Sequence, residues 1–321
     1  MKNRSVSVTG ATGFVGRHVA ESFARDGWDV RAIVRRGNNR PVPPGTAVVE
    51  SDLSRESLTR AVGDSEIVVH CAALIRAATQ SAFEAVNVEG ARAAGSAAAS
   101  VGARLVLISS LAAGGEGTPD APRLESDVPS PVNAYGRSKL AAEHAVSGID
   151  RLRWTILRPS AVYGPFDRGF LPLFRMASRG LFLVPSGPDT SFTLVHIADL
   201  TRAVRLAAES DDAEGQTMFV GHPIPQTGVA VLRAIAAALA RPFRPHQIPV
   251  ALLAAAARVG DLSWRIGVSP LVDSGRLSEL RARGFVCSVD HVRQVLGFAA
   301  STDFEEGIAG TARWYKESAW L

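Results

Sequence analysis

Tyr135 and Lys139 stand four residues apart in the run Asn133-Ala-Tyr-Gly-Arg-Ser-Lys139 and are the strongest candidates for chemistry in this sequence. On a helix, residues i and i+4 share one face, so the ammonium would lie beside the phenol. A neighbouring positive charge favours the ionised phenol and lowers its pKa. Such a phenol can exchange a proton with a substrate hydroxyl or carbonyl near neutral pH. The spacing therefore predicts a tyrosine general acid/base that is assisted by lysine.

The use of lysine at position 139 supports this interpretation. The chain has only three lysines, Lys2, Lys139 and Lys316, and otherwise carries its positive charge on arginine. Arginine would not replace lysine simply, because its guanidinium is broad, planar and never deprotonates. Taken alone, a surface Tyr and a surface Lys on one helix remain the simpler interpretation, and the other motifs must decide.

A glycine-rich loop near the start of the chain predicts a dinucleotide site. The run Thr9-Gly10-Ala-Thr-Gly13-Phe-Val-Gly16 lies between a predicted strand and a predicted helix. Its glycines permit a tight turn and a close approach of the backbone to a pyrophosphate, which the helix N-terminus would attract. A glycine-rich turn in a non-binding sheet is the alternative. The predicted cofactor contacts here are Gly10, Thr12, Gly13, Phe14, Val15 and Gly16.

The end of the second predicted strand indicates which cofactor binds. An NAD site would place a carboxylate there for the ribose 2′-hydroxyl, whereas this strand ends Val34-Arg35-Arg36-Gly37. Guanidinium groups suit a 2′-phosphate. NADP(H) is therefore favoured over NAD(H), with Arg35 the better candidate and Arg36 the second. The alternative is that both arginines are solvated loop residues.

Composition and charge limit the classes of function. The chain has 321 residues, of which 46% are hydrophobic, enough for one large domain or two coupled ones. The formal charge is +4 and the isoelectric point is near 9.5, but the arginines are spread along the chain. We therefore expect a small-molecule substrate and no nucleic-acid partner.

Cysteine usage and apolar runs favour a cytoplasmic protein. Cys71 and Cys287 are far apart and form no CxxC pair, which fits a reducing compartment. The chain starts directly with a strand pattern, so we expect no signal peptide. Its most apolar late stretch, residues 248–257, is too short to span a bilayer. We therefore expect no integral membrane span. The histidines lack metal-ligand spacing, so we also expect no metal.

The first half of the chain alternates strand and helix patterns. Buried-strand patterns cover residues 5–9, 28–34, 47–50, 67–71, 105–108 and 154–157, and helical patterns cover 14–26, 53–62, 83–101 and 134–146. Continuous apolar strands separated by helices are typical of a parallel sheet covered on both faces. The predicted fold class is α/β, a doubly wound parallel Rossmann sheet with a smaller C-terminal substrate lobe.

The pattern becomes irregular after Pro159, which sets the predicted division of the chain. Loop punctuation covers residues 164–169 and 185–188, and short strand and helix signals follow. We expect a dinucleotide-binding Rossmann domain at 1–162, with 190–212 packing back on it. Residues 163–189 and 213–321 would form the substrate-binding lobe.

The motifs occur in the order that characterises a known family. Tyr135 and Lys139 match a YxxxK motif, and the glycine loop matches TGxxGxxG. Further matches are Asp52-Leu53, Val69-His-Cys-Ala-Ala73, Asn87, Ile108-Ser-Ser110, Arg158-Pro159, Val162-Tyr-Gly-Pro165 and Val195-His-Ile-Ala-Asp199. Over nearly its whole length the sequence resembles the extended short-chain dehydrogenases/reductases. That family includes nucleotide-sugar epimerases and dehydratases, 3β-hydroxysteroid dehydrogenases and dihydroflavonol-type reductases.

The resemblance implies a role for each matching residue. Tyr135 would be the general acid/base, and Lys139 would lower its pKa and bind the nicotinamide ribose. Ser110 would hold the substrate oxygen, with Ser109 as the competing assignment. Asn87 would organise the site, or alternatively cap nearby backbone. The remaining cofactor contacts implied by the family are Asp52, Leu53, Cys71, Ala72, Ala73, Pro159 and Val162.

The same resemblance narrows the reaction to hydride transfer. The dehydratase branch usually carries Thr-Asp-Glu where this chain has Ser109-Ser110-Leu111, and leucine cannot act as an acid. The paired arginines favour an exchangeable NADPH and hence a reductase or dehydrogenase. A nucleotide-sugar epimerase with tightly bound NAD is the alternative, and a catalytically silent nucleotide-binding subunit is a second one.

Weaker signals concern the substrate and the oligomer. The apolar segments 248–257 and 262–268 would line a pocket for a hydrophobic alcohol or ketone, or be ordinary core helix. Arg276, Arg281 and Arg283 could instead meet a diphosphate. His196 and Asp199 more simply make a structural bond between lobes than take part in catalysis. The family resemblance implies a homodimer through the helices at 83–101 and 134–146.

Overall fold

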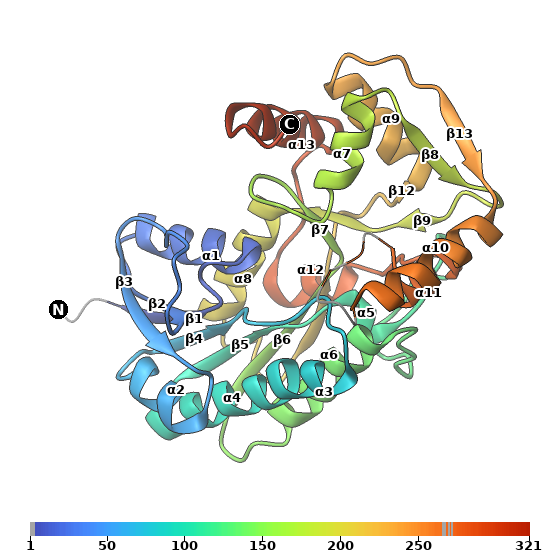
Figure 1. Cartoon of the computed structure of the whole chain (residues 1–321). Coiled ribbons are helices and arrows are strands. Elements are labelled where there is room, and N and C mark those ends of the chain that lie inside the picture. The colour runs from blue at the N-terminus through green and yellow to red at the C-terminus, as the bar shows by residue number, and fades with distance from the viewer. Residues whose placement is uncertain (1–3, 265–267, 269, 271) are drawn as a thin grey trace.

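A seven-stranded parallel sheet forms the centre of the computed structural model, which describes residues 4–264, 268, 270 and 272–321 (Figure 1). Its strand order is β11-β6-β5-β4-β1-β2-β3. The strands are β1 Ser5–Thr9, β2 Asp29–Arg35, β3 Thr46–Ser51, β4 Ile67–His70, β5 Arg104–Ile108, β6 Arg153–Pro159 and β11 Thr217–Val220. The order reverses between β1 and β4, as in a doubly wound Rossmann sheet, so the predicted fold class is confirmed.

Helices cover both faces of this sheet (Figure 1). One core holds α1 (Phe14–Arg25), α8 (Ile197–Glu209) and α12 (Asp290–Leu296) against the sheet. The other face is covered by α2 (Arg55–Val62), α4 (Glu89–Val101) and α6 (Ala134–Ser147). The alanine-rich inner face of α4 allows it to pack closely between α2 and α6.

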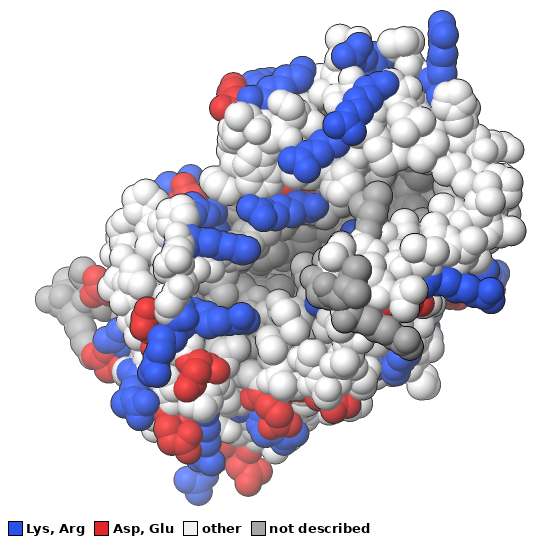
Figure 2. Space-filling model, viewed as in Figure 1, with Lys and Arg blue, Asp and Glu red and all other residues white. Residues whose placement is uncertain are grey.

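A smaller lobe lies above the carboxyl ends of the strands, with a core of its own. Its helices are α7 Leu171–Ser178, α9 Gly228–Ala238, α10 Val250–Ser263, α11 Ser274–Arg281 and α13 Phe304–Glu317. Its short strands are β7 Ala161–Tyr163, β8 Phe182–Pro185, β9 Ser191–Phe192, β10 Leu194–His196, β12 Gln226–Thr227 and β13 Pro245–Ile248. Figure 2 shows the surface hollowed between this lobe and the sheet.

Two parts of the fold differ from the sequence prediction. The helix expected at 83–101 is divided into α3 (Gln80–Phe83), a π-helical turn η1 (Glu84–Val88) and α4. Strand β11 pairs with β6, so the sheet includes residues that the predicted division gave to the substrate-binding lobe. Helix α12 also packs on the sheet, which means that the chain returns to the Rossmann core after building most of the lobe.

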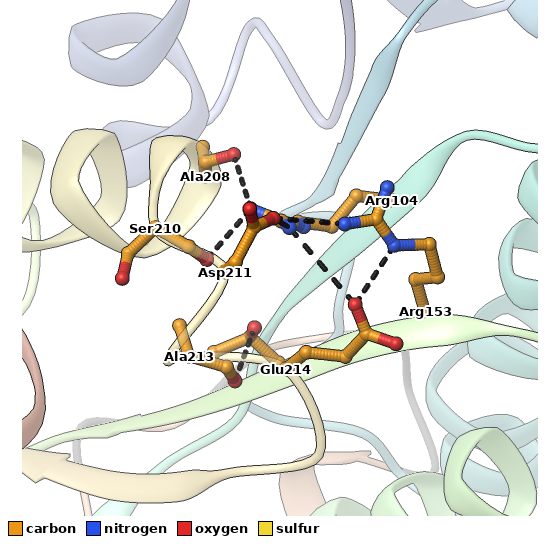
Figure 3. Close-up of polar contacts among 8 residues, drawn as sticks. Arg104, Arg153, Ala208, Ser210, Asp211, Ala213 and Glu214 are labelled. Atoms are coloured by element: carbon orange, nitrogen blue, oxygen red, sulfur yellow. Dashed lines mark hydrogen bonds and ion pairs between the residues drawn. The ribbon is translucent and has the colours of Figure 1, made fainter.

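Ion pairs tie the connection between α8 and β11 to the amino ends of β5 and β6 (Figure 3). The buried guanidinium of Arg104 donates to the carbonyls of Ala208 and Ser210, at 3.2 and 2.7 Å, and pairs with Asp211. Arg153, which is exposed, pairs with Asp211 and with Glu214. This cluster lies at the edge of the sheet opposite the switch-point loops, so its role is structural.

Candidate active site

The glycine loop lies at the switch point, where the carboxyl ends of β1 and β4 meet. Gly10 has a φ of +67°, and a Cβ there would lie 2.8 Å from the backbone nitrogen of Ala72. A Cβ on Gly16 would lie 2.3 Å from the carbonyl oxygen of Gly10. These two close approaches explain why the loop uses glycine, and they bring the segment after β4 against it.

The loop leaves the N-terminus of α1 open for an anion. Gly13 is the N-cap residue, is exposed, and makes no side-chain cap, while its N–H donates to the Gly10 carbonyl at 2.8 Å. The first amides of a 12-residue helix therefore have no side-chain partner. Thr12, Phe14 and Val15 are half-buried around this point. A pyrophosphate fits here because its charge suits both the free N–H groups and the helix dipole.

The end of β2, where the sequence predicts the residues that select the cofactor, lies next to a carboxylate of β3 that the sequence did not indicate. Arg35 and Arg36 are both exposed at the end of β2, as predicted. However, Glu50 of the neighbouring β3 accepts a hydrogen bond from the Gly37 N–H at 3.2 Å. The expectation that no carboxylate is present there is therefore wrong, because the parallel pairing of β2 with β3 supplies one. The guanidiniums of Arg35 and Arg36 and the carboxylate of Glu50 therefore all lie at the carboxyl ends of β2 and β3.

Asp52 and Leu53 follow β3 on the way to α2. Asp52 is exposed and accepts a hydrogen bond from the Ser54 N–H at 2.9 Å, which lowers the pKa of the carboxyl. Leu53 has a φ of +67°, a left-handed conformation that is strained for a branched side chain. This turn places Leu53 against Gly90 of α4 and leaves the Asp52 side chain in solvent.

Tyr135 lies in the first turn of α6, where Asn133 caps the helix by accepting from the Gly136 N–H at 2.8 Å. Ser110, the N-cap residue of the short helix α5 (Leu111–Gly114), lies close enough for its hydroxyl to favour the phenolate of Tyr135. Burial raises the pKa of Tyr135 to about 12. The predicted lowering by Lys139 is therefore wrong for this structure, because desolvation outweighs every stabilisation of the phenolate.

The contacts of Lys139 explain why its charge does not lower the pKa of Tyr135 in this structure. Its Nζ donates to the carbonyl oxygen of Ile108 at 2.6 Å, at the end of β5. Burial lowers the pKa of Lys139 to about 8, while the charge of Glu143 one turn further along α6 opposes that shift. Tyr135, Lys139 and Glu143 follow one another at four-residue spacing, so α6 presents a stripe of titratable groups to the end of β5.

The two adjacent serines point to different partners. Ser110 faces Tyr135, whereas the hydroxyl of Ser109 donates to the buried carboxylate of Glu143. Glu143 is also paired with Arg158 of β6, through Nε–Oε1 and Nη2–Oε2 distances of 3.0 and 2.6 Å. The geometry therefore favours Ser110 as the serine beside the phenol and gives Ser109 a place in the buried ion-pair network.

Asn87 occupies the π-helical turn and holds two segments of the site together. Its Nδ2 donates to the Leu74 carbonyl at 2.9 Å and to the Ser138 hydroxyl at 2.8 Å. Its Oδ1 accepts from the Leu74 N–H at 2.7 Å. The side chain thus fixes the loop after β4 against α6, and its hydrogen bonds go to Leu74 and Ser138. The alternative of a backbone-binding helix residue describes these contacts.

The other predicted cofactor contacts lie along the carboxyl edge. Cys71, Ala72 and Ala73 are half-buried directly after β4, and burial raises the pKa of the Cys71 thiol to about 12. Pro159 ends β6 and is buried, while Val162 lies half-buried in β7. All five residues therefore border the region between the glycine loop and Tyr135.

His70 reinforces this edge without titrating near neutral pH. Its Nδ1 lies 2.9 Å from the Thr9 hydroxyl, which also accepts from the Ala72 N–H at 3.2 Å. Burial and the charge of Lys139 lower the pKa of His70 to about 3. A neutral imidazole therefore links the ends of β1 and β4, a role that the sequence alone did not indicate.

Helix α11 closes over the tyrosine from the other lobe. Glu279 of α11 accepts from the Nδ2 of Asn133 at 2.7 Å, and its charge adds to the upward shift of the Tyr135 pKa. At the start of α11, Asp273 pairs with Arg76 from the loop after β4 at 2.8 Å. Both contacts join residues more than 140 positions apart, so no local pattern could have predicted them.

A cavity of about 910 Å³ lies in the lobe, and the residues that line it do not include Tyr135, Ser110 or Lys139. Its wall is mostly apolar and includes Phe170, Leu173, Leu183, Phe192, Val231 and Leu280. Ala161, the chain neighbour of Val162, also lines it. Arg281 and Arg283 lie at its wall, whereas Arg276 faces Asp167 and Glu279. Residues 265–267 of the predicted apolar segment lie outside the described residues.

Two further predictions concern His196 and metals. Asp199 accepts from the backbone N–H groups of Ser301 and Thr302, at 3.1 and 2.9 Å, while His196 caps α8. These bonds hold the segment that enters α13 to the start of α8.

Among the described residues, no group of three or more His, Cys, Asp or Glu could hold a metal ion. None of the described helices is long and apolar enough to cross a bilayer.

The fold and this edge define a nucleotide-binding Rossmann enzyme of the short-chain dehydrogenase/reductase class. The sequence model of the NAD dependent epimerase/dehydratase family matches residues 6–221. The chain therefore belongs to that family, and the predicted resemblance to the extended short-chain dehydrogenases/reductases is confirmed. Membership makes it an NAD(P)-dependent oxidoreductase or epimerase.

Relatives include both activities. The ceramide reductase of Caulobacter vibrioides is 31% identical, with 98% of this chain and 96% of the relative aligned. The UDP-glucose 4-epimerase of Vibrio cholerae is 27% identical over 97% of this chain and 95% of its own length. Among solved structures, MoeE5 in complex with UDP-glucuronic acid and NAD is 25% identical, with a TM-score of 0.77, 98% of this chain covered and 100% of that one.

Proposed function

We propose that this protein is an NADP(H)-dependent oxidoreductase that transfers a hydride between nicotinamide and the secondary alcohol or carbonyl of a small, largely apolar substrate. Two observations carry the proposal: the phenol of Tyr135 lies near Ser110 at the carboxyl edge of the sheet, and the lobe above that edge encloses a mostly apolar cavity. The ceramide reductase among the relatives supports a reductase with an apolar substrate.

The residues fit the cofactor on structural grounds. The open N-terminus of α1 suits the pyrophosphate, and the exposed Arg35 and Arg36 suit a 2′-phosphate. Glu50 at the same corner would instead suit a ribose hydroxyl, so cofactor preference depends on which charge is nearer the ribose. In Figure 2, Lys and Arg side chains gather at the rim of the hollow on the side of α1 and β3.

The proton step follows from the pKa values of the site. When bound, NADPH supplies the hydride that the substrate carbonyl carbon accepts. Tyr135 then donates its phenolic proton to the carbonyl oxygen, and Ser110 donates a hydrogen bond to the same oxygen. Since burial keeps the pKa of Tyr135 at about 12, the phenol is protonated at neutral pH and ready to act as the acid.

Lys139 and Asn87 position this machinery. The Lys139 ammonium, which donates to the Ile108 carbonyl at the end of β5, would stabilise the phenolate that Tyr135 leaves behind. Asn87 locks α6 to the loop after β4, so the phenol keeps its place relative to the cofactor edge. Both residues support proton transfer without exchanging the substrate proton themselves.

The test is NADPH oxidation with a panel of apolar ketones and aldehydes. Wild-type protein should turn over at least one of them, and Tyr135→Phe should lose at least about a hundredfold in kcat while binding NADPH unchanged. Arg35→Ala should raise the KM for NADPH about tenfold and leave that for NADH nearly unchanged. Equal activity in Tyr135→Phe would refute the assignment of the acid, and a silent nucleotide-binding subunit would show no turnover in either protein.

A nucleotide-sugar epimerase is the second candidate. Arg281 and Arg283 at the cavity wall would suit a diphosphate, and a UDP-glucose 4-epimerase is among the relatives. Epimerases of this kind regenerate their cofactor and retain it. Denaturing the purified protein and assaying the released nucleotide separates the two: retained NAD would favour the epimerase, and an empty protein that binds NADPH would favour the reductase.

We also propose the homodimer that the family resemblance implies. Helices α4 and α6 pack against each other on one face of the sheet. A second copy would add its own α4 and α6 to this pair. Sedimentation at micromolar protein concentration measures the mass directly, and a monomer would reject the dimer.

A further inference from the structure

Helix α10 exposes an apolar face to solvent. It packs on the lobe through Ala257 and Gly260, and a Cβ on Gly260 would lie 1.9 Å from the Val272 carbonyl oxygen. On the opposite face Leu252, Val259 and Leu262 are 61%, 69% and 59% exposed. Residues spaced by three, four and seven positions share one face of a helix. The outward stripe is therefore made of large aliphatic side chains, the reverse of an ordinary surface helix.

Alanines extend this stripe, and one charged residue lies within it. The exposed small residues of α10 are Ala251, Ala255 and Ala256. Arg258 is the charged side chain on this side of the helix, while Asp261 turns toward the start of α11 and accepts from the Ser274 N–H at 3.0 Å. Contiguous exposed apolar surface of this kind marks a docking site.

The charge around α10 is strongly basic. Among the described residues between positions 240 and 283, Asp261 is the only exposed carboxylate. The exposed arginines in the same described stretch are Arg241, Arg244, Arg258, Arg281 and Arg283. In Figure 2 the surface over α10, at the right of the view, is mostly white with basic side chains at its lower edge. An apolar stripe with a cationic rim complements an anionic lipid surface.

Helix α10 borders the apolar cavity at its first residue. Val250, the first residue of α10, lines that cavity, as do Leu280 and Arg281 of the neighbouring α11. Helices α10 and α11 pack against each other. A molecule that leaves a lipid layer beneath α10 would therefore meet the cavity within the same two helices.

We propose that α10 docks this protein on the surface of an anionic membrane and that an apolar substrate enters the cavity from the lipid. Apart from Arg258 the stripe is aliphatic, and its cationic rim complements anionic headgroups, which favours lipid as the occupant. The helix has 14 residues and lies on the membrane rather than across it. Substrate entry rests on the proposed function, whereas the docking itself does not.

The docking is tested by sedimenting the full-length protein with vesicles of phosphatidylcholine mixed with phosphatidylglycerol, and with vesicles of phosphatidylcholine alone. Wild-type protein should pellet with the anionic vesicles and be released by high salt. Val259→Asp and Leu252→Asp should each weaken this binding on the order of tenfold, because a charge replaces an inserted aliphatic group. Val48→Asp is the matched control, since Val48 is 56% exposed on β3, the edge strand on the side of the molecule away from α10 (Figure 1).

Several outcomes would overturn the proposal. Wild-type protein that stays in the supernatant with anionic vesicles would do so, as would Val259→Asp that pellets like wild type. A concentration-dependent dimer that Val259→Asp dissociates, without vesicle binding, would show that the face joins two copies instead. NADPH oxidation with a water-dispersed short ketone is measured separately and should be equal in wild type and Val259→Asp. Its absence from both, with vesicle binding intact, would refute the oxidoreductase and leave the docking standing.

Discussion

The buried pair between Arg158 and Glu143 allows a quantitative test of the structure. Their side chains are 6% and 5% exposed, and two hydrogen bonds join them. Arg158→Met removes the guanidinium, keeps an unbranched side chain near Phe219, and leaves the Glu143 carboxylate buried without its main partner. Removing one member of a buried pair costs about 3–5 kcal/mol, since the remaining charge is then uncompensated.

This loss should be visible as a shift in melting temperature. A chain of 321 residues has an unfolding entropy of about 0.7 kcal/mol per kelvin by the usual per-residue value. A loss of about 4 kcal/mol in the free energy of unfolding therefore lowers Tm by about 6 °C. Differential scanning fluorimetry of the purified variant, with near-ultraviolet circular dichroism as a second probe, measures the shift.

Two companion variants separate burial from charge. Arg158→Met combined with Glu143→Met replaces both ions by apolar groups and should recover most of the lost stability, to within about 2 °C of wild type. Arg153→Met is the matched control, because Arg153 is 47% exposed in its pair with Glu214. An exposed pair is worth at most about 1 kcal/mol, so this Tm should fall by less than about 2 °C. Equal losses in Arg158→Met and Arg153→Met would refute the reasoning.

Three further predictions follow from the same site and its surroundings. Gly16→Ala should weaken NADPH binding at least about tenfold, because its Cβ would lie 2.3 Å from the Gly10 carbonyl oxygen, whereas Gly310→Ala, with open space around it, should bind normally in a fluorescence titration. The kcat/KM for carbonyl reduction should fall as pH rises through about 8, where Lys139 loses its proton, and a profile that stays flat to higher pH would contradict its role. The pKa of Asp167 is raised to about 6, so between pH 4 and pH 6 the folded state holds a proton that the unfolded state releases. The contribution of Asp167 to the free energy of unfolding should therefore decrease from pH 4 to pH 6. Urea titrations of Asp167→Asn should lack this pH dependence.

The sequence predicted the elements that depend on local pattern. Apolar runs bounded by turn residues gave all six expected strands to within a few residues, because the strands of a parallel sheet covered on both faces are rich in apolar residues. The placement of Tyr135 and Lys139 on one helix follows from the same local rule. The glycine loop was equally readable, since its backbone demands glycine at Gly10 and Gly16 whatever the rest of the chain does.

What the sequence missed depends on tertiary packing. Glu50 reaches the Gly37 N–H only because β2 and β3 pair in parallel with Glu50 opposite Val34. Glu279 reaches Asn133 only because α11 folds back over α6, across 146 positions of the chain. The outward face of α10 was likewise unreadable, since an apolar helical run indicates burial unless the packing of its neighbours is known.

The error on the Tyr135 pKa has a direct consequence for the direction of catalysis. Spacing alone places a cation beside the phenol and predicts a phenolate, but the structure buries the phenol, gives the Lys139 ammonium to the Ile108 carbonyl and adds the charge of Glu279. All three changes keep the phenol protonated, which is the state required to reduce a carbonyl. Alcohol oxidation needs the phenolate and hence the extra positive charge of an oxidised nicotinamide. We therefore expect kcat/KM for oxidation to rise with pH above neutrality while that for reduction does not, and parallel profiles in the two directions would contradict this account.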